Sequence, residues 1–269
     1  MSFPLDVLDL AESRRLGEPV RAFDARPDFR RAVTWLVLLG PAGVLLVASS
    51  LFYLVVGPRW LGAVGVLLAA AYLGGVGSIV RGAALRGRGL AVYAFEDGLV
   101  RLTPRGTSAH RWDELHSVTM AMVRPASRGR RTQWRFTVTG ADGAHFVLGD
   151  ELPGVRDLGE AIVAEVARRE LPRRLAEVEE GRTVRFGPFT VDGTGVGKDG
   201  EDGKDGEVVP WESAGESGIG NGQVYVRRSD GTRAMSAAVG LVPDALVFVG
   251  LCRRMRDTAG SVPARRASR

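Results

Sequence analysis

The sequence predicts an α+β protein in which a pair of membrane-crossing helices is followed by two units of antiparallel sheet, each with a C-terminal helix. Three observations lead to this fold class. Two long apolar stretches without charge lie in the first third of the chain. After residue 88 the pattern changes to short β-rich runs separated by turn residues, and the order of these runs occurs twice.

The two apolar stretches are residues 32–56 and 61–80, and neither contains a charged residue. A hydrocarbon core of about 30 Å requires about 20 residues of apolar helix, so each stretch is long enough to cross a membrane. Because a mostly polar segment precedes the first stretch, a cleaved signal peptide is not expected. The sequence therefore predicts a transmembrane helical hairpin, with a buried hairpin of a soluble protein as the alternative.

Basic residues lie on one side of this hairpin, and Lys and Arg resist translocation. Only Arg59 lies in the turn between the stretches. The arginines that flank the outer ends are Arg14, Arg15, Arg21, Arg26, Arg30, Arg31, Arg81, Arg86 and Arg88. We therefore expect a multi-pass protein of the cell (inner) membrane with both termini in the cytoplasm.

The net charge of +5 and the pI of about 9.9 do not predict a nucleic-acid partner. The excess of positive charge is spread along the chain and includes the C-terminal tail, so it marks no single basic domain. Cys252 is the only cysteine, which excludes an intrachain disulfide and agrees with a reducing cytoplasm.

Two units follow the hairpin, and the same landmarks occur in the same order in each. Every unit has an Asp-Gly hairpin signal, then a Trp followed by an acid, then a second Asp-Gly signal and a closing helix. In the first unit these landmarks are Asp97-Gly98, Trp112-Asp113, Asp142-Gly143 and a helix from residue 155 with an end or kink at Pro172. In the second unit they are Asp192-Gly193, Trp211-Glu212, Asp230-Gly231 and a helix over residues 243–256. Unequal spacings indicate a degenerate duplication, with chance similarity as the alternative.

The predicted organisation has five parts. We expect a cytoplasmic N-terminal segment, the transmembrane hairpin, a first unit, a second unit and a disordered basic tail. These parts are residues 1–31, 32–81, 82–180, 181–257 and 258–269. We also expect the second unit to be too brief for the full set of strands.

Trp112 and Trp211 are the predicted structural anchors of the two units. Each follows a turn-rich connection, so we expect it to start a strand and to bury its ring. The indole N–H then needs an acceptor, and the neighbouring acid is one candidate. Contact with a ligand is the alternative role.

These features resemble the bacterial pleckstrin-homology-like (PH-like) module. The residues that carry the resemblance are Phe-Glu-Asp-Gly-Leu-Val-Arg-Leu at 95–102, Trp-Asp-Glu-Leu at 112–115 and the amphipathic closing helix. With Val-Asp-Gly-Thr-Gly-Val-Gly at 191–197, Asn-Gly-Gln-Val-Tyr-Val-Arg-Arg at 221–228 and the helix at 246–255, the chain also resembles an uncharacterised actinobacterial membrane-protein family. The resemblance implies an antiparallel sheet or partly open barrel capped by a helix, with a binding or scaffolding role and no catalytic residues.

Several motifs could indicate an enzymatic or metal-binding role, but their surroundings in the sequence do not fit one. The Gly-x-Gly-x-x-Gly pattern at 195–200 precedes an acidic, glycine-rich stretch rather than the helix that a dinucleotide site needs. The three histidines, His110, His116 and His145, form no zinc motif, although even spacing would place the first two on the face of Trp112 in a regular strand. We therefore expect no catalytic residues, no metal and no cofactor.

The strongest candidate surface is an arginine-rich stretch that is expected to form a long hairpin loop. It contains Arg124, Arg128, Arg130, Arg131 and Arg135 without an acid, and Trp134 lies beside the last of them. Near an anionic leaflet each Arg can contribute about 1 kcal/mol of attraction. The loop is thus a candidate for contact with anionic lipid headgroups or a protein partner, while a solvated loop is the alternative.

The sequence favours a non-enzymatic integral inner-membrane protein that presents two cytoplasmic modules to a protein or to the membrane surface. One alternative is a sensor of anionic lipid headgroups that uses the arginine loop. The other is an enzyme whose site lies between the units.

Overall fold

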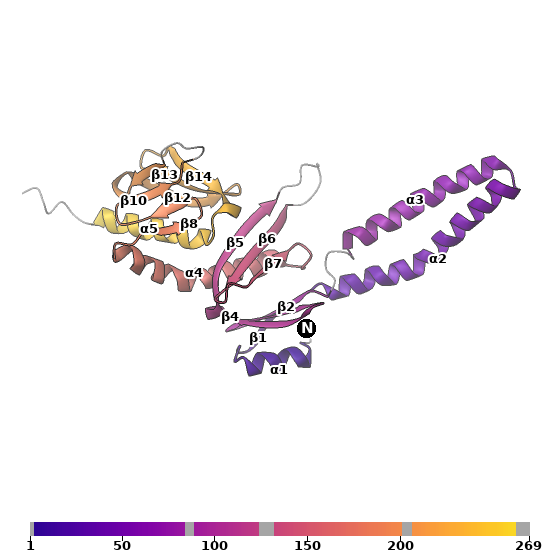
Figure 1. Cartoon of the computed structure of the whole chain (residues 1–269), viewed down its shortest axis with the longest axis horizontal. Helices are drawn as coiled ribbons and strands as arrows, with labels where there is room; N and C mark the ends of the chain where they lie inside the picture. The colour runs from indigo at the N-terminus through magenta and orange to yellow at the C-terminus, as the bar shows by residue number, and fades with distance from the viewer. Residues whose placement is uncertain (1–2, 84–88, 124–131, 201–205, 262–269) are drawn as a thin grey trace, which may run out of the picture. The chain divides into compact units, whose positions relative to one another are not determined.

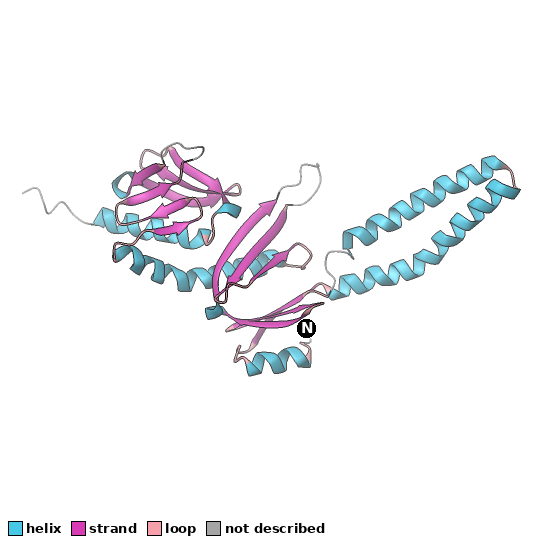
Figure 2. Ribbon diagram, viewed as in Figure 1, coloured by secondary structure: helices cyan, strands magenta, loops and turns pink. Residues whose placement is uncertain are grey.

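The computed structural model describes residues 3–83, 89–123, 132–200 and 206–261 (Figure 1). The chain divides into two compact units, whose bounds differ from those of the two repeated units expected from the sequence. The first contains residues 1–109 and 151–153, and the second contains residues 110–150 and 154–269. The predicted α+β class is confirmed, with two long apolar helices followed by antiparallel sheets and a C-terminal helix (Figure 2).

The first unit combines a four-stranded antiparallel sheet with three helices. In chain order its elements are α1 (Leu5–Ser13), β1 (Pro19–Asp24), α2 (Arg26–Val56), α3 (Arg59–Ala83), β2 (Ala91–Phe95), β3 (Gly98–Thr103) and β4 (Gly106–Arg111). The strand order is β1-β2-β3-β4. Helix α1 packs on this sheet, where Val7 and Ala11 join a core with Tyr93 and Phe95.

Strand β1 lies before the apolar helices in sequence, yet it pairs with β2, which follows them. The register places Phe23 opposite Val92 and Asp24 opposite Ala91. The α2–α3 hairpin is therefore inserted between two neighbouring strands of one sheet. The sequence predicts a separate N-terminal segment for these residues, without a strand, whereas the structure places β1 in the sheet.

Helices α2 and α3 form an antiparallel pair that is long and apolar enough to cross a membrane, at Val33–Val56 and Trp60–Ser78. Small residues allow close contact between them. A Cβ atom at Gly62 would lie 2.7 Å from the backbone nitrogen of Leu54, and Ala69 is 4% exposed. The Tyr72 hydroxyl donates a hydrogen bond of 2.9 Å to the Leu39 carbonyl. These contacts fix the pairing of the two helices.

The second unit contains two three-stranded sheets, a four-stranded sheet and two long helices. Its first elements are η1 (Trp112–Glu114), β5 (Leu115–Val123), β6 (Gln133–Gly140), β7 (His145–Gly149) and α4 (Val155–Glu179). The remaining elements are β8 (Val184–Phe186), β9 (Phe189–Val191), β10 (Gly195–Lys198), β11 (Glu207–Pro210), η2 (Trp211–Ser213), β12 (Ala214–Gly220), β13 (Gln223–Arg228), β14 (Arg233–Ala238), η3 (Val239–Leu241) and α5 (Ala245–Ser261). The sheets have the orders β5-β6-β7, β8-β9-β10-β11 and β12-β13-β14.

Helix α4 continues through Pro172, where the sequence predicted an end or a kink. A proline removes one backbone hydrogen bond, but packing holds the helix on both sides of it. Before Pro172, Leu158 and Ile162 are buried on the face that meets the β5-β6-β7 sheet. After it, Leu175 and Val178 pack into the core formed with α5. The helix is therefore continuous across the proline, so the predicted end is wrong.

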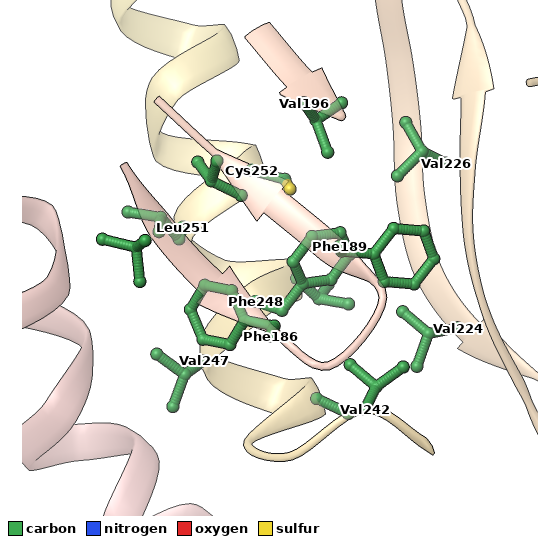
Figure 3. Close-up of a cluster of buried hydrophobic side chains, with 14 of the residues drawn as sticks. Phe186, Phe189, Val196, Val224, Val226, Val242, Val247, Phe248, Leu251 and Cys252 are labelled. Atoms are coloured by element: carbon green, nitrogen blue, oxygen red, sulfur yellow. The ribbon is translucent and has the colours of Figure 1, made fainter. Parts of the chain in front are cut away.

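The core of residues 184–252 is aromatic at its centre (Figure 3). The rings of Phe189 and Phe248 are stacked with centroids 4.8 Å apart, and Phe186 meets Phe248 edge-on at 5.6 Å. Cys252 is buried in the same core, and burial raises the pKa of its thiol far above the usual range. Its role here is that of a small apolar side chain.

The predicted landmarks fall at equivalent places in the two halves of the chain. The first Asp-Gly pairs lie between β2 and β3 and between β9 and β10, and the second between β6 and β7 and between β13 and β14. Asp142, Asp192 and Asp230 each accept a hydrogen bond from the backbone nitrogen two residues later, at 2.8–2.9 Å. This alignment makes β1 the counterpart of β8. The second half thus has seven strands, so the expectation that it is too short for them is wrong.

Candidate functional site

Most of the predicted arginine surface lies outside the described residues, namely Arg124, Arg128, Arg130 and Arg131. Arg135 is described and is exposed in β6, opposite Ala121 of β5 and Gly149 of β7. Its neighbour Trp134 is held against the sheet and α4. The Trp134 ring stacks on Phe136 with a centroid distance of 6.2 Å, and the Arg156 guanidinium lies 5.3 Å from its centroid. The structure therefore places Trp134 in a cation–π contact.

Trp112 and Trp211 are both 6% exposed, and each begins a 3₁₀ turn immediately before a strand. The indole N–H of Trp211 donates a hydrogen bond of 2.9 Å to the backbone carbonyl of Asp192. The acceptor is thus the Asp-Gly turn on the neighbouring sheet, and not the adjacent Glu212, which is exposed. This bond links two landmarks that the sequence repeats.

A cluster of charged residues lies where β1 passes into α2. Asp24 accepts hydrogen bonds from the backbone nitrogen of Arg26 at 2.8 Å, from its Nε at 2.9 Å and from its Nη2 at 2.8 Å. Nη2 also donates to the hydroxyl of Tyr93 in β2. The cluster is fixed further by the backbone nitrogen of Ala25, which donates to the carbonyl of Leu90 at 3.1 Å.

The electrostatics of this cluster keep Asp24 and Arg26 ionised. Burial acts to raise the pKa of Asp24, but the hydrogen bonds from Arg26 and the positive charges of Arg26 and Arg30 outweigh it, so this pKa lies below its usual value. The hydrogen bond to Asp24 raises the pKa of Arg26 despite partial burial. Asp24, Arg26, Pro27 and Arg30 line an open cavity of about 250 Å³. This corner is a small, positively charged recess.

Asp244 is a buried acid that no motif in the sequence predicts. It is 7% exposed, has a φ of 52°, and lies immediately before α5. Its Oδ1 accepts a hydrogen bond of 2.7 Å from the backbone nitrogen of Val118 in β5. Burial raises the pKa of Asp244, and the charge of Glu170 adds to this, while hydrogen bonds from Val118 and Ser117 and the charge of Arg174 act in the opposite direction. The Pro-Asp pair before an apolar helical run signals only a helix start.

The remaining motifs have structural surroundings. The Gly-x-Gly-x-x-Gly stretch begins in β10, which pairs with β11 and leads into no helix. His110 stacks on Phe146 with centroids 5.3 Å apart, and the η1 turn separates it from His116, so the two do not share one regular strand. Within the described residues, no three His, Cys, Asp or Glu side chains gather as metal ligands.

Comparison with known proteins identifies a family but no function. No curated protein and no solved structure matches the chain. A family of unknown function, DUF6585, matches residues 2–258. The match extends over both apolar helices and all the sheets, in agreement with the expected membership of an uncharacterised family. The chain belongs to the DUF6585 family.

Proposed function

We propose that this chain is an integral membrane protein whose α2–α3 hairpin holds two cytoplasmic PH-like modules, which act as a scaffold that binds a partner protein. The observation that carries the proposal is the insertion of the hairpin between β1 and β2. Since these strands are neighbours in one sheet, both ends of the hairpin emerge on the same side of the membrane, next to the folded module.

The exposure of the hairpin supports a lipid environment. Only 11% of each apolar window is buried, whereas a core helix of a soluble protein is mostly buried. Large apolar side chains such as Val55, Leu67 and Val44 are 83%, 71% and 68% exposed. Soluble proteins rarely expose contiguous apolar surfaces larger than a few hundred Å². A hydrocarbon layer is the solvent that suits these helices.

The sheets support the assignment of PH-like modules. Residues 184–261 consist of four antiparallel strands, a Trp turn, three antiparallel strands and a closing helix, and the same order of elements precedes them. A sheet framework closed by a helix suits a binding role, in which exposed loops and strand edges contact the partner.

Topology can be tested by labelling single cysteines. Cys252 is the only native cysteine, so a Cys252→Ala background contains no other thiol that the label could modify. We expect a membrane-impermeant maleimide to label Pro58→Cys in intact cells and to label Asp230→Cys only after lysis. Carbonate washing should leave both variants in the membrane. Extraction by carbonate would contradict the membrane assignment, and the reverse labelling pattern would contradict the orientation.

A second candidate function is sensing of anionic lipid headgroups through the loop from Arg124 to Arg135. The exposure of Arg135 favours it. Hydrogen exchange distinguishes the two functions. It is measured on the full-length protein in phosphatidylcholine nanodiscs, with and without phosphatidylglycerol. A scaffold should show the same exchange at residues 132–140 in both lipids. Protection that requires phosphatidylglycerol and disappears when all five arginines are changed to Gln would favour the sensor.

A further inference from the structure

We propose that the recess at the start of α2 binds the phosphate of an anionic phospholipid headgroup, with Arg30 and Arg26 as its ligands. The inference rests on the proposed function, because it requires α2 to enter the membrane. It concerns a different surface from the arginine-rich stretch that contains Arg124 and Arg135. No residue outside the described part of the chain is needed for it.

The recess is built on a fixed corner of the first unit. Ala25 is 3% exposed and is the single residue between β1 and α2, and its backbone nitrogen is bonded to Leu90. Asp24 pairs with Ala91 in the sheet register, and Arg26 is hydrogen-bonded to Asp24 and Tyr93. The first turn of α2 therefore has a defined position on the sheet, and the positions of its charged side chains follow from it.

The positive charges that line the recess outnumber the negative charge that lines it, and Asp6 is a further acid whose charge acts on Arg26. Asp24 compensates Arg26, whose Nε and Nη2 are occupied while Nη1 takes no part in these bonds. The side chain of Arg30 is exposed, and within the described residues its guanidinium has no hydrogen-bond or ion-pair partner. The lining side chains carry a net charge of +1 from Arg26, Arg30 and Asp24. Nη1 of Arg26 and the guanidinium of Arg30 are the donors that an oxyanion would find.

The position of the recess along the membrane normal matches that of the lipid phosphates. The apolar span begins at Val33, three residues after Arg30. At about 1.5 Å of rise per residue, Arg30 lies about 4–5 Å outside the hydrocarbon, within a headgroup layer that is about 5–8 Å thick. The cavity of about 250 Å³ is smaller than the sites of most drug-sized ligands, and it suits a small polar group.

Asp24 indicates which kind of phosphate the recess prefers. Asp24 stays ionised because Arg26 holds its pKa low, so the site opposes a second negative charge on the ligand. A phosphodiester with one negative charge, as in phosphatidylglycerol, fits the net charge better than a dianionic monoester. A free inorganic phosphate ion offers related chemistry without the membrane, and the experiment must separate the two sources.

Native mass spectrometry of the full chain in detergent tests the proposal, with phosphatidylglycerol, phosphatidylcholine or inorganic phosphate added. We expect one tightly bound phosphatidylglycerol and no comparable phosphatidylcholine. Arg30→Gln should weaken phosphatidylglycerol binding about tenfold or more, since charge-assisted hydrogen bonds are lost. Arg31→Gln is the matched control, because it makes the same charge change one residue away without lining the recess, and it should change binding less than about twofold.

Equal effects of the two substitutions would overturn the proposal, because they would indicate general attraction to anionic lipid. Competition by inorganic phosphate at millimolar concentration would overturn the assignment to lipid. Thermal unfolding of both variants should match the unchanged protein, which excludes misfolding as the cause. If Arg30→Gln binds lipid normally while carbonate washing leaves the chain in the membrane, only this inference fails. Loss of the chain from the membrane would instead refute the proposed function.

Discussion

Val118 and Asp244 hold each other through two hydrogen bonds. The backbone nitrogen of Val118 donates to Oδ1 of Asp244 at 2.7 Å, and the backbone nitrogen of Asp244 donates to the carbonyl of Val118 at 3.0 Å. Val118 belongs to β5, the edge strand of its sheet, and Asp244 precedes α5. The pair satisfies backbone groups on the unpaired edge of β5, where Val118 is buried, and it ties the helix of the second half to a sheet of the first half.

Replacing Asp244 distinguishes its hydrogen bond from its charge. Asn keeps an acceptor at Oδ1 and tolerates a positive φ, so Asp244→Asn should be as stable as the original or more stable. Asp244→Ala leaves the Val118 N–H without its acceptor and places a Cβ residue without a polar side chain at a φ of 52°, and it should cost about 2 kcal/mol. Urea unfolding in detergent, followed by Trp fluorescence, measures both. Equal losses in the two variants would contradict the role of the acceptor.

The same acid predicts a pH dependence. Because the pKa of Asp244 is raised in the folded chain, the folded state binds the proton more tightly than the unfolded state does. Its contribution to stability is therefore full below the unfolded pKa and is lost as the pH rises through the folded pKa. The stability advantage of Asp244→Asn should thus grow between about pH 4 and neutrality. An advantage that is constant over this range would show that Asp244 titrates as in the unfolded chain.

Trp211 offers a test of the landmark repeated in both halves. Trp211→Ala removes a ring that is 6% exposed and should cost about 3–5 kcal/mol. Trp211→Phe keeps most of the buried apolar area but leaves the carbonyl of Asp192 without its donor, so it should cost about 1–2 kcal/mol. Fluorescence-monitored unfolding should show the original chain as the most stable, Trp211→Phe as intermediate and Trp211→Ala as the least stable. A loss below about 1 kcal/mol for the Ala variant would contradict a core position.

Local patterns in the sequence predicted local structure well, and they missed partners that are distant in the chain. Turn residues between β-rich runs predicted hairpins such as the one between β6 and β7 at Asp142-Gly143, and apolar length predicted the α2–α3 hairpin. Strand β1 was missed because its partner lies beyond the whole hairpin. Asp244 was missed because its meaning depends on Val118, which is 126 positions away. A recess formed by a strand end and a helix start was equally invisible, since its arginines served only to predict orientation.

Gly159 in α4 allows close packing against the sheet. A Cβ atom there would lie 2.3 Å from the ring of Phe136, which is fully buried. Although alanine is favoured over glycine in a helix by about 1 kcal/mol, overpacking of this core should make Gly159→Ala unstable by about 1–3 kcal/mol. Gly159→Ala should lower the stability less in a Phe136→Leu background than in the original chain, because the smaller Leu side chain leaves room for the added methyl group. If the two substitutions are additive in thermal unfolding, the contact is not the cause.

Two glycines of α3 provide a matched test of the hairpin. A Cβ atom at Gly62 would lie 2.7 Å from the backbone nitrogen of Leu54, whereas a Cβ atom at Gly74 would meet no described atom within 4 Å beyond its chain neighbours and the backbone of its own helix. Both changes to Ala add the same methyl group and the same helix propensity, so any difference reflects contact with α2. Gly62→Ala should separate the helices at the turn and lower stability by about 2 kcal/mol, since backbone cannot move aside as a side chain can. Gly74→Ala should be neutral or slightly stabilising. Scanning fluorimetry of the detergent-solubilised chain measures both, and a loss at Gly74 instead would show that this face of α3 contacts another molecule.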